Sequence, residues 1–354
     1  MIGIEIVASV DRENAIFLTG ETAYVVVTLR NTVQIGNSLA WGCVQLHCDQ
    51  ILGKEEKQKP SDSVTALPHG KTALYSSKPM IIFCDIKLNS GEVLEYSGSF
   101  EIPTNLPPSF KGSFVKYSWY ITVAVQHVDA PFKLLQLPLR VLNFNIPIEL
   151  PLNTAGNPFL AQNYKHPPVL DFARTAIDET TSARHHKYFK INNGTDSFAT
   201  VALFKNIFKL GDDITCRLTF DQKPNLRCTV VTIRLETIEE DLQNDKNVPN
   251  VTIHFVKYIV TMFMQDCHCI LSIPGNAIPA FTTDAVCLRW RLHFDFLVSN
   301  GSPIDQNTTA CSTIKKELQC EKIPWDHYIQ VHACNPFNVN LACSNSISSV
   351  IENV

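Results

Sequence analysis

Apolar and polar residues alternate along residues 106–125, LPPSFKGSFVKYSWYITVAV, and this pattern predicts a long β-strand. Apolar side chains recur at every second position from Val115 to Val125, so they share one face. The opposite face is mixed and carries Lys116, Ser118, Tyr120 and Thr122. Pro107 and Pro108 stand at the entrance, where a missing backbone donor is tolerated. The stretch therefore indicates a sandwich strand with one face on a core.

The same landmarks return in the second half of the chain, in residues 279–298, PAFTTDAVCLRWRLHFDFLV. Aligning Phe110 with Phe281 places Trp119 on Trp290 without a gap. Upstream, FLTGETAYVVVT (17–28) and FKLGDDITCRLT (208–219) each contain a glycine that an acidic residue follows. Downstream, the strings LPL (137–139) and IPW (323–325) both open a closing strand. Landmarks that recur in the same order predict a duplicated β-domain.

We therefore expect an all-β protein of two tandem immunoglobulin-type β-sandwiches, since 354 residues exceed what one core usually holds. Residues 169–183 are the only stretch with helical spacing of apolar positions. The simplest interpretation is a short linker helix, and a partner-docking helix is the alternative. The predicted division is an N-terminal sandwich at 1–150, a linker at 151–187, a C-terminal sandwich at 188–335 and a polar tail at 336–354.

Charge and hydropathy bear on the partners and the cellular compartment of the protein. The net charge is −4 with both signs scattered along the chain, so there is no basic footprint for nucleic acid. No apolar run approaches the ~18–20 residues that span a bilayer. The N-terminus, MIGIEIVASV, alternates like a first strand and lacks the features of a signal peptide. We expect a cytosolic chain whose twelve cysteines are reduced thiols.

The cysteines and histidines offer one candidate metal site, Asp266-Cys267-His268-Cys269. On a strand Cys267 and Cys269 face one side and His268 the other, and no second ligand pair lies nearby, so buried thiols are the favoured interpretation. Six other cysteines lie in apolar, strand-like surroundings, where cysteine behaves as a small hydrophobe: Cys43, Cys48, Cys84, Cys216, Cys228 and Cys287. His185-His186 has no oriented partner that would make it a base.

No motif for catalysis or cofactor binding emerges from the remaining residues. The chain has neither phosphate-binding glycine loop nor a G-x-S-x-G elbow. Asp171 and Asp178 lie about 10 Å apart along the expected helix, too far for a shared site. Trp119 and Trp290 favour core packing over interface anchoring because their positions match. Four basic residues cluster in the sequence around the first tryptophan strand: Lys111, Lys116, Lys133 and Arg140. The favoured interpretation is a solvated face, and the alternative is a surface that binds an acidic membrane or an acidic partner. We predict no catalytic, cofactor-binding or metal-binding residue.

Several strings in both halves carry a family resemblance. They are LAWGCVQLHC (39–48), IIFCDIKLNSGEVLEYS (81–97), LPPSFKGSFVKYSWYITV (106–123), LFKNIFKLGDDI (203–214) and CLRWRLHFDF (287–296). The chain resembles the Rgp family in these strings, and its two tandem sandwiches resemble the arrestin fold.

The resemblance implies a function by assembly and not by catalysis. Such proteins join a large Ric-type subunit with a β-propeller, and the pair releases GDP from a Golgi Rab GTPase of the Rab-six class in retrograde transport. We therefore expect a non-enzymatic scaffold subunit, cytosolic and peripheral on the Golgi membrane. The alternative is an arrestin-type trafficking adaptor, a ubiquitin-ligase or retromer-like one, although neither proline pair continues into a P-P-x-Y ligand. The resemblance assigns no partner-binding residue.

Overall fold

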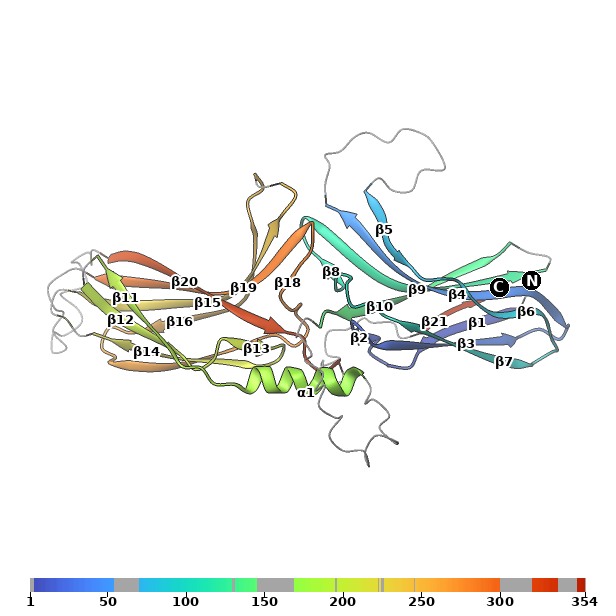
Figure 1. Cartoon of the computed structure of the whole chain (residues 1–354), viewed down its shortest axis with the longest axis horizontal. Helices are drawn as coiled ribbons and strands as arrows, with labels where there is room; N and C mark the ends of the chain where they lie inside the picture. The colour runs from blue at the N-terminus through green and yellow to red at the C-terminus, as the bar shows by residue number, and fades with distance from the viewer. Residues whose placement is uncertain are drawn as a thin grey trace, which may run out of the picture. The chain divides into compact units, whose positions relative to one another are not determined.

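The computed structural model describes residues 3–53, 70–128, 131–144, 169–194, 196–221, 223, 226–244, 246–299, 320–336 and 349–353. Strands dominate this part of the chain, and its one α-helix is α1 (Val169–Ser182) (Figure 1). The strands form four sheets in two compact units. The predicted all-β class, with two sandwiches and a short helix, is confirmed.

Unit 1 comprises Met1–Ala176, Phe281–Val286 and Asn335–Val354. One of its sheets has the strand order β21-β1-β3-β7, from β1 (Ile4–Val10), β3 (Thr22–Asn31), β7 (Val93–Glu101) and β21 (Ser349–Asn353). The other has the order β2-β10-β9-β4-β5, with β6 paired to β4 and β8 to β9. Its strands are β2 (Ile16–Leu18), β4 (Asn37–Leu52), β5 (Lys71–Ser76), β6 (Met80–Leu88), β8 (Phe110–Lys111), β9 (Val115–His127) and β10 (Lys133–Leu142).

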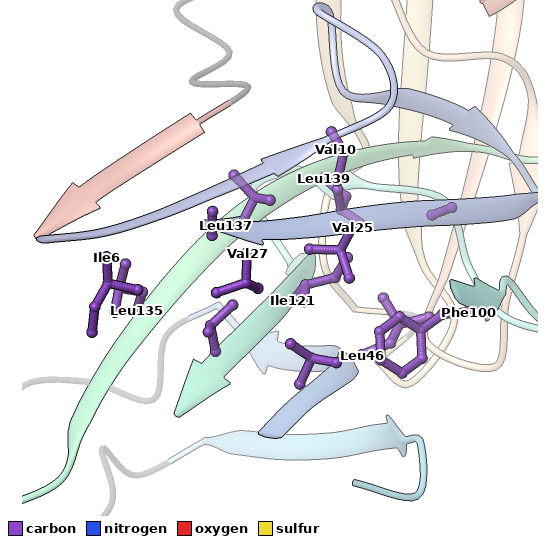
Figure 2. Close-up of a cluster of buried hydrophobic side chains, with 14 of the residues drawn as sticks. Ile6, Val10, Val25, Val27, Leu46, Phe100, Ile121, Leu135, Leu137 and Leu139 are labelled. Atoms are coloured by element: carbon purple, nitrogen blue, oxygen red, sulfur yellow. The ribbon is translucent and has the colours of Figure 1, made fainter. Parts of the chain in front are cut away.

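The core of unit 1 lies between these two sheets, as Figure 2 shows. Ile6, Val25 and Phe100 enter it from one sheet. Ile121 and Leu137 enter it from the other. Buried and less buried positions alternate most regularly along β1, whereas all three residues of β2 are buried. Facing apolar sides that interdigitate in this way define a β-sandwich.

Unit 2 comprises Ile177–Ala280 and Cys287–Cys334. Its first sheet has the order β11-β12-β14-β17, from β11 (Lys187–Asn193), β12 (Asp196–Leu203), β14 (Asp213–Phe220) and β17 (Asp266–Ser272). Its second sheet has the order β13-β20-β19-β15-β16. The strands are β13 (Ile207–Lys209), β15 (Arg227–Asp241), β16 (Asn250–Val260), β19 (Val286–Ser299) and β20 (Cys320–His332). The two-residue strand β18 (Phe281–Thr282) lies in the segment that is grouped with unit 1.

The duplication predicted from the two tryptophan strands extends to individual hydrogen bonds. The indole Nε1 of Trp119 donates to the carbonyl of Pro107 at 2.9 Å, and that of Trp290 donates to the carbonyl of Ile278 at 3.0 Å. Both bonds span 12 residues. Both rings are almost fully buried, at 2% and 0% exposure, so core packing of the tryptophans is confirmed. A buried indole needs such an acceptor, which explains why proline-rich entrances precede both strands.

The glycine turns also match. Gly20 and Gly211 have φ of 88° and 87°, a left-handed conformation that favours glycine. Each turn follows a short strand that pairs in parallel with the closing strand of its unit, β2 with β10 and β13 with β20. The recurring glycine of the sequence therefore marks the same turn in both sandwiches.

The fold differs from the expectations in some details. The helix begins at Val169 as expected and ends at Ser182, one residue early. The predicted polar tail contributes β21, and this strand pairs antiparallel with β1. The pairing satisfies backbone groups on the outer edge of β1. Residues 151–168 of the predicted linker and 301–319 of the polar insertion lie outside the described residues.

Cysteine burial follows the expectation only in part. Cys48, Cys216 and Cys228 are buried as small hydrophobes, whereas Cys84 is exposed. Phe83 takes the inward position of β6, so the neighbouring Cys84 faces away from the core. No disulfide joins the ten cysteines among the described residues.

Candidate partner-binding surface

The candidate metal string lies on β17, with alternate residues on opposite faces. Cys269 is buried and Cys267 is half-buried, while Asp266 and His268 are exposed. The carboxylate of Asp266 accepts hydrogen bonds from Arg217. Within the described ranges no group of three or more His, Cys, Asp or Glu side chains is placed to hold a metal ion. The four residues therefore do not meet as ligands.

The other predicted candidates are also separated by the fold. His186 packs edge-on against Phe204, at 5.2 Å between ring centroids. Asp178 on α1 pairs with Lys209 at 2.5 Å. Lys111 and Lys116 lie directly opposite each other on β8 and β9 and are exposed. Lys133 lies farther along, opposite Val125. These residues do not form a convergent constellation.

An apolar strip on β16 is the most prominent exposed feature of unit 2. Five side chains share the face of β16 that points away from the core, with exposed fractions of 74% for Tyr258, 68% for Val260, 49% for Ile253, 43% for Val251 and 38% for Val256. Their shared face follows from the register, which sets them opposite outward residues of β15. We call these five residues the β16 strip.

The β16 strip also lies at a sheet edge. Among the described strands β16 pairs with β15 alone, so the backbone groups on its other side lack a strand partner. Edge strands in stable monomers are usually short, bulged, charged or covered. This strand has 11 residues, a bulge opposite Leu235 and Glu236, and five exposed apolar residues. Such an edge fits a protein partner better than water.

Beside the β16 strip, the same face of the sheet carries a network of charged side chains. Glu236 accepts from Arg291 at 2.6 Å, and Arg291 also contacts Asp326 at 3.2 Å. Asp295 accepts from Arg234 at 2.6 Å. His293 bridges Asp295 and Asp326 through its two ring nitrogens, at 3.0 and 2.5 Å. Each carboxylate of the network therefore has at least one basic side chain as partner.

The electrostatics of Asp295 reflect this network. Burial pushes the pKa of this carboxyl up, but hydrogen bonds from Lys322 and His293 and the nearby Arg234 outweigh burial and hold the pKa below its ordinary value. Asp295 is therefore an anion at neutral pH. It anchors the cationic side chains on the middle of the sheet.

The matching face of unit 1 is polar in a different way. The hydroxyl of Tyr120 donates to Asp49 at 2.5 Å, and Lys71 pairs with the same carboxylate at 2.8 Å. Burial, followed by the hydrogen bond to Asp49, raises the pKa of Tyr120. Tyr120 lies on the face of β9 that the sequence predicts to be mixed, where Asp49 binds its hydroxyl and its ring stacks on His47.

The β16 strip is exposed apolar surface on an edge strand among the described residues. No helix in the described part of the chain is both long and apolar enough to cross a membrane. The sequence carried one signal for the strip, since NVTIHFVKYIV (250–260) is apolar at both odd and even positions. That pattern is typical of a strand buried on both faces, so only the fold reveals the exposure.

Comparison with known proteins bears on both units. The Rgp1 family model matches residues 5–150 and 152–299. The chain belongs to the Rgp1 family. Among its relatives is the RAB6A-GEF complex partner protein 2 of Homo sapiens, 29% identical over 98% of this chain and 99% of that protein. The protein of the same name from Bos taurus is 30% identical over 94% of this chain and 95% of its own length.

In this member of the Rgp1 family, the family match spans the β16 strip, the charged network on β15 and β19, and the polar face around Asp49. The tail strand β21 lies beyond the matched residues. The name of the two relatives describes a protein that works as a partner in a complex.

Proposed function

We propose that this chain is a non-catalytic subunit of a guanine-nucleotide exchange complex for a Golgi Rab GTPase of the Rab6 class. The observation that carries the proposal is the match along nearly the whole length of two proteins named as partners in a RAB6A exchange complex. The larger subunit would be the Ric-type, propeller-containing protein that the family resemblance implies. The setting would be retrograde transport, with the complex peripheral on the Golgi membrane.

An exchange factor acts by binding the nucleotide-free GTPase more tightly than the loaded one. This differential affinity requires a shaped surface on the complex and no general base. A scaffold subunit contributes by holding the larger subunit in its active form. The β16 strip is our candidate for the surface that the larger subunit covers, because it combines an open strand edge with exposed apolar side chains.

The test is purification of the tagged chain from its own cells, followed by GDP release from a Rab6-class GTPase. We expect one large propeller-containing subunit to co-purify, and the pair, but not this chain alone, to accelerate release. Recovery of receptors and a ubiquitin ligase, with no effect on release, would contradict the proposal and move the chain to the adaptor class.

The docking surface has its own test. The double variant Tyr258→Glu, Val260→Glu places two charges on the β16 strip and should reduce co-purification of the large subunit at least tenfold, since burying an unpaired charge costs more than about 1.4 kcal/mol. Tyr188→Glu is the control, because Tyr188 is an exposed aromatic of the other sheet, on β11. Equal effects of the two changes would exclude the β16 strip as the docking surface.

A further inference from the structure

Four cysteines gather at one edge of the interior of unit 2. Cys216 on β14 and Cys269 on β17 are both fully buried and directly opposite each other in the antiparallel ladder. Cys267 follows on the same face of β17 and is half-buried. Cys228, at the start of β15, interacts electrostatically with Cys267. The described residues of unit 1 contain no comparable group of thiols.

The geometry of Cys216 and Cys269 suits a disulfide. Directly opposite residues in an antiparallel pair have Cα atoms about 4.5–5.5 Å apart, in either type of pair. Natural disulfides span Cα separations of about 4.4–6.8 Å. The two residues are direct partners in the ladder between β14 and β17. Joining the sulfur atoms requires rotation of the two side chains and no change in strand register.

The two sulfur atoms are chemically unequal. The neighbouring Cys216 thiol and the Lys257 ammonium group on β16 lower the pKa of Cys269. The neighbouring Cys269, together with burial, raises the pKa of Cys216. Cys269 therefore has the character of an attacking thiolate and Cys216 that of a resolving thiol.

We propose that Cys216 and Cys269 are an oxidisable pair, which a hydroperoxide converts into a cross-strand disulfide. The Cys269 thiolate attacks one peroxide oxygen, the O–O bond breaks, and Cys269 becomes a sulfenic acid while hydroxide leaves. The Cys216 sulfur then attacks the Cys269 sulfur and displaces the second oxygen. The thiol proton of Cys216 goes to the departing oxygen, and the proton that Cys269 lost on ionising goes to the hydroxide. With hydrogen peroxide, two thiols and one peroxide therefore yield one disulfide and two waters.

The internal duplication argues that the sandwich does not need these thiols. Aligning Gly20 with Gly211 places Val25 on Cys216. The residue opposite Val25 in unit 1 is Gly98. The same ladder position therefore folds without sulfur in unit 1. Folding of the sandwich therefore does not require cysteines at these two opposite positions.

The location of the pair gives a small oxidant a route to it. β17 is the last strand of one sheet and β16 the last strand of the other, and a loop of five residues joins the two. Edge elements open more readily than central strands, because they have fewer contacts to break. Opening at this edge would expose Cys269, which lies two residues from the half-buried Cys267 on the same strand.

The experiment uses the reduced full-length chain and graded hydrogen peroxide. Remaining thiols are then blocked with N-ethylmaleimide, and the digested protein is analysed for linked peptides by mass spectrometry. We expect the Cys216–Cys269 linkage to form before any other. Lys257→Met should slow its formation about three- to tenfold, because each unit by which the Cys269 pKa rises reduces the thiolate fraction up to about tenfold.

Two variants make the assignment specific. Cys267 and Cys269 share a tryptic peptide, so Cys267→Ser is needed to show that the linkage persists without Cys267. Cys216→Val, which introduces the residue of the matching position in unit 1, should abolish the linkage and leave a sulfenic acid on Cys269 that dimedone traps. A disulfide of Cys267 or Cys228 that forms before the Cys216–Cys269 linkage would overturn the proposal. The proposal would also fail if N-ethylmaleimide still alkylates Cys216 and Cys269 when the exposed Cys84 is already oxidised.

Discussion

At the scale of single residues, the charged network on β15, β19 and β20 is held by carboxylates that face several cations at once. Asp295 receives hydrogen bonds from Arg234, His293 and Lys322. Its side chain is 11% exposed, whereas that of Lys322 is 62% exposed. The contacts are therefore neither fully buried nor fully screened. Such partly exposed ion pairs contribute about 1 kcal/mol to the free energy of unfolding, less than the loss on breaking a fully buried ion pair.

The lowered pKa of Asp295 gives a pH-dependent prediction. A carboxyl whose folded-state pKa is depressed contributes stability above its unfolded pKa of about 3.9 and loses it as pH falls through the folded value. Asp295→Asn should therefore lower the free energy of unfolding by about 1 kcal/mol at pH 7 and by progressively less below about pH 4. Urea denaturation at several pH values measures this difference.

The control for Asp295 is Asp196→Asn. Asp196 also pairs with a lysine, Lys223 at 2.8 Å, but its side chain is 62% exposed. We expect a change below about 0.5 kcal/mol at every pH, because water screens the pair. A pH-independent loss in Asp295→Asn would show that packing, and not charge, accounts for the role of Asp295.

At the scale of elements, the edge strands distinguish the two units. In unit 2 the strand beside β12 is β11, which directly precedes it along the chain. In unit 1 the corresponding place beside β1 is taken by β21, from the far end of the chain. Nothing in the composition of SVIEN (349–353) singles it out as that partner. A short edge strand depends on its ladder bonds, which the tertiary structure supplies.

Removing the tail should therefore act on one edge of one sheet. Deletion of residues 335–354 leaves the outer backbone groups of β1 to water, so amide hydrogens of residues 4–10 should exchange faster, by about tenfold or more. Amides of β12 in unit 2 should keep their rates, which makes them the internal control. Unchanged exchange in β1 would mean that β21 contributes no stability to the edge.

At the scale of the whole molecule, the apolar surface of the chain is larger than a solitary protein needs. The β16 strip offers an unpaired edge and five exposed apolar side chains. Exposed apolar edges drive association between copies when no natural partner covers them. The free chain and its complex should therefore differ in solution behaviour.

We predict that the isolated chain self-associates as its concentration rises, and that Tyr258→Lys, Val260→Lys suppresses this association. Lysine on an edge strand prevents strand pairing because its charge resists burial. Light scattering across a concentration series measures the effect, with Tyr188→Lys as the control. A monodisperse, cooperatively melting wild-type monomer would contradict the expected dependence on a partner.

The sequence by itself determined the class of fold, the duplication and the family. Alternation along Val115–Val125, the pairing of Trp119 with Trp290 and the two glycine turns are local features, and local features follow from strand periodicity and backbone sterics. Tertiary structure decided which strands lie at edges. The sequence of β16 is typical of a strand buried on both faces. Its residues are exposed because no further described strand of the sheet pairs with its outer edge. The thiol pair likewise arises from register between strands about 50 residues apart, which no local pattern encodes.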